Sequence, residues 1–195
     1  MILGLLLIAA ALGLVLYNRW DSDRAGRESA QVLEVLTEAI EKNARTQNGD
    51  DADRMEQIRA EQNEMAAEEI DGSLYIGKID IPSQGISLPV MADWDYTRLT
   101  IAPCRYAGSY YTDDLVICAH NYDEHFSPIK WIDIGADVYF TTVNGAKYCY
   151  TVSNRETVQP KAIEEMIGDG DWDLTLFTCN IGGRTRCAVR CTRVD

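Results

Sequence analysis

The chain has 195 residues, of which 46% are hydrophobic and 25% are charged, and its formal net charge is −13. This composition is typical of a globular protein and excludes extensive disorder. The negative charge argues against binding of nucleic acid, because that requires clustered Lys and Arg side chains facing the phosphates.

The first 20 residues are expected to form a transmembrane anchor. Residues 2–17 include no charged side chain, and Tyr17 and Trp20 are aromatics of the kind found at a membrane interface. A cleaved signal peptide is the alternative, but no basic residue precedes the apolar run and no small-residue cleavage pattern follows it. The bases after the span would place that side in the cytoplasm, and a basic segment ahead of Met1 would reverse this orientation.

Residues 21–71 are acidic, with 15 acids and 6 bases, and are predicted to be largely helical. Apolar side chains recur at helical spacing from Val32 to Ile40, and polar turn residues interrupt the pattern at 46–51. Residues 52–70 favour a second helix with few apolar positions. The region is compatible with two interpretations, a solvated stalk and a helical cap packed on the rest of the chain.

Residues 72–195 are predicted to form a mainly β domain. Short β-rich runs lie at residues 74–82, 86–91, 114–120, 136–143, 147–158, 173–179 and 185–194. Asn144-Gly145 separates two of these runs and predicts a hairpin. One short helix is expected around Pro160–Ile167. Seven or eight short strands with one or two short helices predict a closed or nearly closed β-barrel.

Three groups suited to acyl transfer lie at strand ends. His120 ends one apolar run, Cys179 ends another, and Arg184 and Arg186 follow as the chain returns. A thiolate can attack a carbonyl, an imidazole can move the protons, and a guanidinium can stabilise the oxyanion. His125 is a weaker alternative to His120, because it lies in the following loop and is expected to face the surface or a substrate.

These residues resemble the sortase family. Residues 174–179, LTLFTC, followed seven positions later by Arg186, are similar to the TLxTC…R signature of sortases, and His120 matches the sortase histidine. The resemblance covers residues 74–194, including the opening YIGKIDIP. It implies an eight-stranded β-barrel and a cysteine transpeptidase with His120, Cys179 and Arg186 as catalytic residues. Arg186 is preferred because Arg184 falls in the loop before the final strand and Arg190 is more distant.

The resemblance also implies a substrate and a location. Such enzymes cut an LPxTG-like sorting signal after its threonine and pass the acyl group to an amine of a cell-wall precursor or a pilin. We expect a single-pass protein of a Gram-positive type cell envelope, with the catalytic domain outside the cytoplasm. A hydrolytic cysteine peptidase of the envelope and a non-enzymatic membrane-tethered barrel are the alternative functions.

The subclass is less sharply defined. Helices ahead of the barrel resemble class B. The helix expected between the strands at 147–158 and 173–179 is, however, shorter than the one that class B members usually carry there. Class D and pilin-type sortases are therefore alternatives. No DPW- or DPF-like lid motif precedes the barrel, and Trp94, inside the barrel region, is the nearest candidate.

No cofactor is expected. The acid pairs Asp113-Asp114 and Glu164-Glu165 are candidate calcium ligands, although paired acids on solvated loops are more common without a metal. Cys118 lies two residues before His120 and is expected to line the same cleft, where it could form an inhibitory disulfide with Cys179. The sequence leaves open any pairing among the other thiols, which are Cys104, Cys118, Cys149, Cys187 and Cys191.

Overall fold

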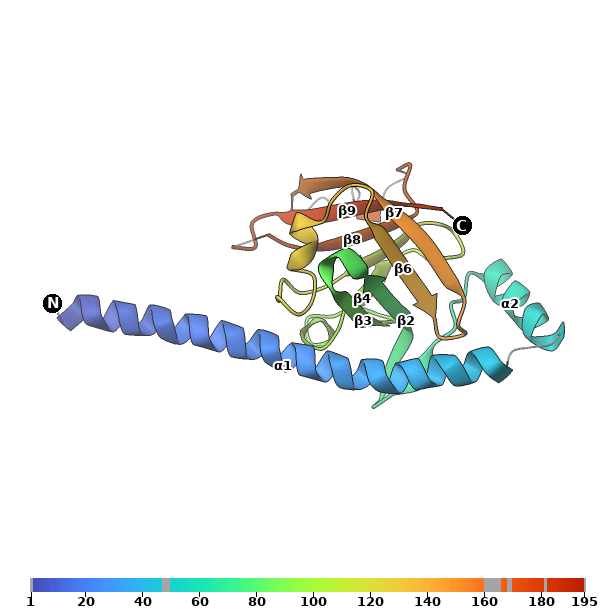
Figure 1. The fold of residues 1–195 in the computed structure, drawn as a ribbon, viewed down its shortest axis with the longest axis horizontal. Coiled ribbons are helices and arrows are strands. Elements are labelled where there is room, and N and C mark those ends of the chain that lie inside the picture. The colour runs from blue at the N-terminus through green and yellow to red at the C-terminus, as the bar shows by residue number, and fades with distance from the viewer. Residues whose placement is uncertain (1, 47–49, 160–165, 168–169, 181, 195) are drawn as a thin grey trace.

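The computed structural model describes residues 2–46, 50–159, 166–167, 170–180 and 182–194. Within these residues two α-helices, α1 (Ile2–Thr46) and α2 (Asp50–Gln62), precede the sheet (Figure 1). The strands are β1 (Glu68–Ile70), β2 (Ser73–Ile81), β3 (Ile86–Met91), β4 (Cys104–Ala107), β5 (Leu115–Cys118), β6 (Asp137–Thr142), β7 (Lys147–Val158), β8 (Leu174–Cys179) and β9 (Arg186–Arg193). Short 3-10 helices cover Pro82–Gln84, Arg98–Thr100 and Pro128–Trp131.

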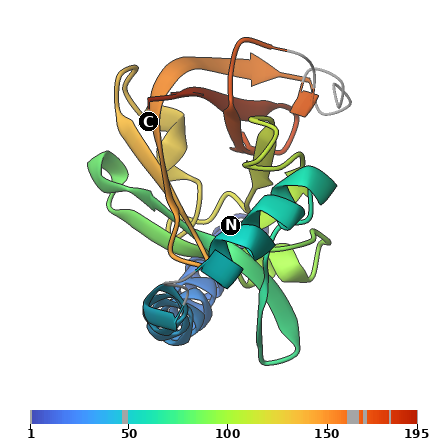
Figure 2. The same cartoon turned by 90° about the vertical axis from the view of Figure 1, so that its right-hand side faces the viewer.

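Strands β2 to β9 close into an eight-stranded barrel. Their order is β2-β3-β4-β5-β8-β9-β7-β6, and β6 pairs back with β2. The pairs β3–β4 and β5–β8 are parallel, whereas the other neighbours are antiparallel. Figure 2 shows the barrel with α1 seen end-on beside it. The predicted mainly β, eight-stranded barrel is confirmed, and β1 is a ninth strand that pairs with the start of β2.

The barrel interior is filled by alternating apolar side chains from β2, β3, β5, β6, β7, β8 and β9. On β8, for example, Leu174 and Leu176 belong to the interior cluster, whereas Thr175 between them lines a cavity outside it. Closure depends on a glycine in β2. A Cβ atom at Gly77 would lie 2.1 Å from the carbonyl oxygen of Thr141, so only glycine lets β6 approach this closely.

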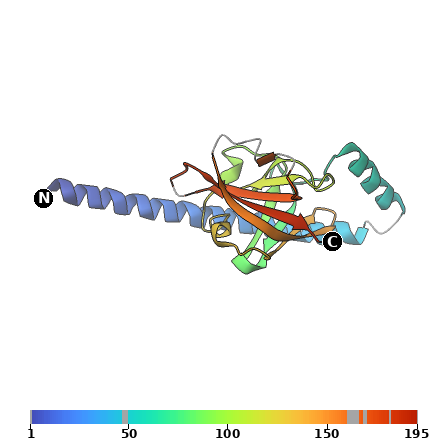
Figure 3. The same ribbon diagram turned by 90° about the horizontal axis from the view of Figure 1, so that it is seen from above.

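Helix α1 joins the apolar segment and the first half of the acidic region in one continuous helix of 45 residues (Figure 3). Its N-terminal part is exposed and is long and apolar enough to cross a membrane. From Ser22 onward one face is buried on the barrel, and Leu36 and Ile40 join a second apolar cluster with Tyr75 and Met91. These contacts favour the helical cap for residues 21–46, and the division into anchor, cap and barrel remains our proposal.

The predicted second helix is too long. Helix α2 ends at Gln62, and Glu68–Ile70, expected to be helical, forms β1 instead. Burial of Ile70 in the second cluster and pairing with β2 outweigh the local helical propensity. Few apolar side chains were expected on α2, and its contacts are polar. Glu56 accepts hydrogen bonds from the Tyr111 hydroxyl at 2.6 Å and from the Asn144 amide at 3.1 Å.

The remaining strand predictions are largely confirmed. The hairpin around Asn144-Gly145 is formed by β6 and β7. Strand β4 was not predicted, because its four residues between Pro103 and Gly108 carry no clear alternation. The helix expected at Pro160–Ile167 falls largely outside the described residues.

The packing of α1 predicts how much stability is lost when one of its buried side chains is shortened. Leu36 is fully buried, so Leu36→Ala should lower the free energy of unfolding by about 2–4 kcal/mol. The neighbouring Val35 is 51% exposed, and Val35→Ala is the matched control, with an expected loss below about 1 kcal/mol. Urea unfolding of the full chain in detergent, followed by tryptophan fluorescence, measures both. Equal losses would contradict the docking of α1.

Candidate active site

Parallel pairing of β5 with β8 brings the histidine and the cysteine to the same edge of the barrel. Past the end of β5, the Ala119 N–H donates to the carbonyl oxygen of Phe177 at 3.2 Å. The Thr178 hydroxyl donates to the carbonyl oxygen of Ala119 at 2.9 Å. These bonds hold the residue before His120 against the residues before Cys179.

Arg186 enters the same edge from the neighbouring strand. It begins β9 directly opposite Cys179 in the β8–β9 register. Its guanidinium donates to the carbonyl oxygens of Gly183 at 3.0 Å and Thr185 at 3.3 Å, which hold it over the turn. Arg184 is exposed in that turn, so the register favours Arg186 of the two.

Arg190, the third candidate, has a different environment. Its side chain is 1% exposed, and Nε donates to Glu156 Oε1 at 2.8 Å. Nη1 donates to Thr175 Oγ1 at 2.9 Å, and the guanidinium lies 4.3 Å from the Trp172 ring centroid. Arg190 is therefore a buried, paired charge that holds Glu156 of β7, Thr175 of β8 and Trp172 together.

A groove of about 300 Å³ opens at this edge. Its lining residues are Trp94, Tyr96, Leu99, Tyr106, Cys118, Ala119, His120, Met166, Phe177, Thr178, Cys179 and Arg186. Packed aromatic rings form one wall, with centroids 5.2 Å apart for Trp94 and Tyr106 and 5.1 Å apart for Tyr106 and Phe177. The groove thus combines an apolar wall with the thiol, the imidazole and the guanidinium.

Trp94, the nearest candidate for a lid, lies in the β3–β4 loop at this groove. The sequence identified neither Tyr106 nor the aromatic wall. Tyr106 belongs to the unpredicted β4, which lies between β3 and β5, and its ring packs on Phe177 of β8.

Burial sets the protonation of the histidine at the groove. It lowers the pKa of His120, and the carboxylate of Asp21 on α1 partly opposes this effect. The imidazole is therefore mainly neutral at physiological pH and able to accept a proton.

His125 does not face the surface or a substrate, as was expected. It is fully buried, and burial, followed by the charge of nearby His120, lowers its pKa to about 4. The expectation failed because α1, distant in sequence, covers this loop. His125 is a neutral packing residue.

Lys130, on the 3-10 helix Pro128–Trp131, was not singled out from the sequence. Burial lowers its pKa, whereas Asp123, Cys187 and Cys179 raise it. With Asn180 it lines a separate cavity of about 500 Å³.

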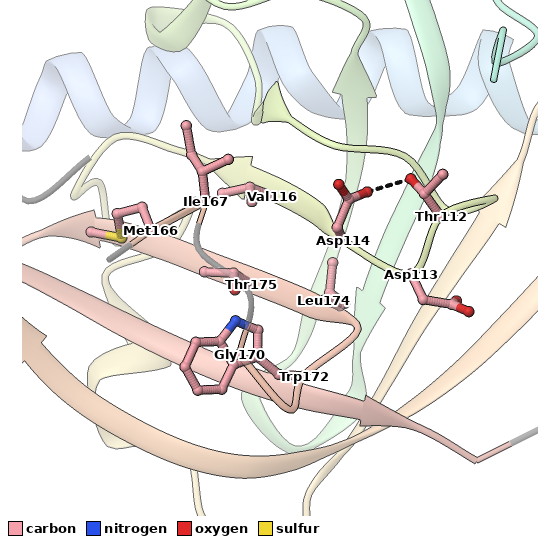
Figure 4. A pocket seen from close by; sticks show the side chains of 10 residues that line it. All are labelled: Thr112, Asp113, Asp114, Val116, Met166, Ile167, Gly170, Trp172, Leu174 and Thr175. Carbon is pink, nitrogen blue, oxygen red and sulfur yellow. Dashed lines mark hydrogen bonds between the residues drawn. The ribbon is translucent and has the colours of Figure 1, made fainter. Parts of the chain in front are cut away.

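A cavity of about 270 Å³ lies further along the outer face of β5 and β8 (Figure 4). Figure 4 labels its lining residues, among them the candidate calcium ligands Asp113 and Asp114. Asp113 pairs with Arg193 at 3.0 Å, and Asp114 accepts hydrogen bonds from the Ser109 N–H and the Thr112 hydroxyl. Among the described residues no cluster of three metal-ligating side chains is found, and Glu164-Glu165 lie outside them.

All six cysteines lie in the described residues, and none of them forms a disulfide bond. Cys118 lines the groove with Cys179, as expected, and the disulfide between them remains a prediction. Burial raises the pKa of the four enclosed thiols, Cys104, Cys118, Cys187 and Cys191. Cys179 and Cys149 are partly exposed.

Comparison with known proteins identifies the family. The family model described as "Sortase domain" matches residues 79–194, which include His120, Cys179 and Arg186. The chain belongs to the sortase family. Among curated proteins no sequence matches significantly.

Solved sortase structures share the fold. Sortase C of Streptococcus pneumoniae superimposes with a TM-score of 0.65 at 21% identity, over 83% of this chain and 97% of that one. Sortase A of Corynebacterium diphtheriae gives 0.58 at 20% identity, over 95% and 96%. A pilus-related sortase C of Group B Streptococcus gives 0.56 at 25% identity, over 65% and 70%. None of these three is named as class B, so they add no support for that expectation.

The environments of the thiols predict their reactivity. With limiting iodoacetamide at neutral pH, Cys179 of the native full chain should be alkylated well before the four buried cysteines, because their thiols are enclosed and protonated. Peptide mapping by mass spectrometry measures the order of modification. Cys149→Ser is the control that removes the other partly exposed thiol. Modification of Cys118 or Cys187 at the rate of Cys179 would contradict this description of the site.

Proposed function

We propose that this protein is a membrane-anchored sortase that cleaves an LPxTG-like sorting signal after its threonine and transfers the acyl group to an amine. The acceptor is an amine of a cell-wall precursor or of a pilin subunit. The observation that carries the proposal is the meeting of His120, Cys179 and Arg186 in one groove at the edge formed by β5, β8 and β9.

The neutral state of the His120 imidazole supports a thiol–imidazole mechanism. Neutral His120 takes the proton of the Cys179 thiol, and the thiolate attacks the carbonyl carbon of the signal's threonine. Arg186, permanently charged, stabilises the oxyanion of the tetrahedral intermediate. The imidazolium then protonates the leaving amine, and the peptide bond breaks to leave a thioester on Cys179.

The second half-reaction reverses these roles. The acceptor amine attacks the thioester carbonyl, and His120 accepts a proton from the amine as the new amide bond forms. The proton then returns to the Cys179 sulfur as it leaves. The wall of Trp94, Tyr106 and Phe177 suits the apolar residues of an LPxTG-like peptide.

The apolar start of α1 supports a location at the cell membrane. We propose a single-pass protein in a Gram-positive type envelope, with the barrel outside the cytoplasm, where sorting signals and their acceptors meet. This orientation requires the bases after the span to lie outside, against the simple charge rule. Labelling of a cysteine introduced in α2 with a membrane-impermeant reagent on intact cells tests it.

Substitutions at the site test the proposed chemistry. Cys179→Ala should abolish both acyl-enzyme formation and transfer, because the nucleophile is lost. His120→Ala should lower the rate at least about 100-fold, because His125 is buried and cannot replace it. Arg186→Lys should lower it about 100-fold, since a point charge replaces the planar fork of donors. The measurement is turnover of an LPxTG-like peptide with and without an added amine.

Arg184→Lys is the matched control for Arg186→Lys, because its exposed side chain lies two residues away in the same turn. It should retain near wild-type turnover. Collapse in Arg184→Lys with normal turnover in Arg186→Lys would show that the wrong arginine was chosen. Turnover independent of the amine would indicate a hydrolytic peptidase, and normal turnover in Cys179→Ala would exclude the sortase mechanism.

A further inference from the structure

The loop that follows His120 is fastened to α1 immediately after the apolar segment. The Tyr122 hydroxyl donates to Asp21 Oδ2 at 2.6 Å, and the Asp123 N–H donates to the Ser22 hydroxyl at 3.1 Å. Each bond joins residues 101 positions apart in the sequence. The segment just outside the apolar span is therefore part of the scaffold beneath the active site.

Aromatic packing carries this attachment to the catalytic histidine. The Tyr122 ring stacks on the His120 ring, with centroids 4.8 Å apart and an interplanar angle of 29°. On the Tyr122 ring the buried His125 packs edge-on at 5.4 Å. The hydroxyl of Tyr122 is held by Asp21 and its ring by His125, so the ring is a fixed surface against which the imidazole rests.

We propose that Asp21 and Tyr122 are positioning residues for His120, so that the part of α1 that directly follows the apolar segment contributes to the active site. The proposal rests on the function proposed above. Neither residue lines the groove, so both act on the reaction through His120. Asp21 orients Tyr122, and Tyr122 orients the plane of the imidazole toward Cys179.

The charge of Asp21 adds a second effect. The hydrogen bond from Tyr122 and then the ion pair with Arg24 lower the pKa of Asp21, so it is a carboxylate at physiological pH. It favours the imidazolium that forms when His120 takes the thiol proton. Among the described residues, the other ionisable groups that pack on His120 or line its groove come from several elements. They are Tyr122 and neutral His125 from its own loop, Tyr96 from the β3–β4 loop, Tyr106 from β4, Cys118 from β5, Cys179 from β8 and Arg186 from β9.

The test compares variants of the full chain in detergent micelles. Asp21→Asn removes the carboxylate, and Tyr122→Phe keeps the stacked ring but loses the hydroxyl. Tyr122→Leu loses the ring as well. Asp21→Glu keeps the charge. Asp23→Asn is the matched control, because Asp23 is exposed two residues along the same helix.

Two properties of each variant test the proposal, and a third measurement checks its fold. The first is the His120 pKa, measured by NMR titration of ¹³C-labelled histidine. The chain has only two histidines, and His125 stays neutral until about pH 4. The second is the rate of acyl-enzyme formation with an LPxTG-like peptide. Thermal melting of each variant reports whether the fold is retained.

The proposal predicts that Asp21→Asn lowers the His120 pKa and slows acylation about tenfold while the fold is retained. Tyr122→Phe should show a smaller loss than Tyr122→Leu, Asp21→Glu should recover most of the rate, and Asp23→Asn should match wild type. An unchanged His120 titration and rate in Asp21→Asn would overturn the proposal. Loss of rate that only follows loss of folded protein would also overturn it.

The proposed sortase function and the positioning role of Asp21 are contradicted by different results. If the wild-type chain forms no acyl-enzyme, the proposed function fails. The titration of His120 in Asp21→Asn, compared with Asp23→Asn, still decides whether Asp21 controls the histidine, because it requires no substrate.

Discussion

The parallel pairing of β5 with β8 is the constraint on which the candidate site depends. Parallel strands end at the same edge of a sheet, so His120 and Cys179 meet although they lie 59 positions apart in the sequence. The return of the chain into antiparallel β9 then places Arg186 opposite the cysteine. Pairing of β2 with β6 closes the barrel, so the strands that carry the site belong to a sheet without a free edge.

Helix α1 adds a second support that a barrel alone would lack. Its apolar start suits a membrane, its middle holds the loop after His120, and its end contributes Leu36 and Ile40 to an apolar cluster. The helix holds the loop after His120 close to the end of the apolar segment. In the membrane-anchored enzyme that we propose, this loop therefore lies near the membrane surface.

Much of this could be predicted from the sequence, because the information is local. Alternation of apolar residues predicts strands such as β7 and β8, and Asn144-Gly145 predicts the hairpin that joins β6 to β7. The His and Cys at strand ends predict the chemistry. Contacts between distant segments could not be predicted in this way. β1 is helix-forming in isolation, β4 is too short to show a pattern, and the burial of His125 and the Asp21–Tyr122 bond arise only once α1 docks.

The central claim is that Cys179 is the nucleophile of an acyl transfer. Intact mass spectrometry of the full chain after incubation with an LPxTG-like peptide, followed by peptide mapping, tests it most directly. The account predicts a single thioester adduct on Cys179 that carries the part of the peptide ending in threonine and that is discharged by an added amine. An adduct on another cysteine would contradict the account, as would an adduct that amines do not discharge, or none across a library of such peptides.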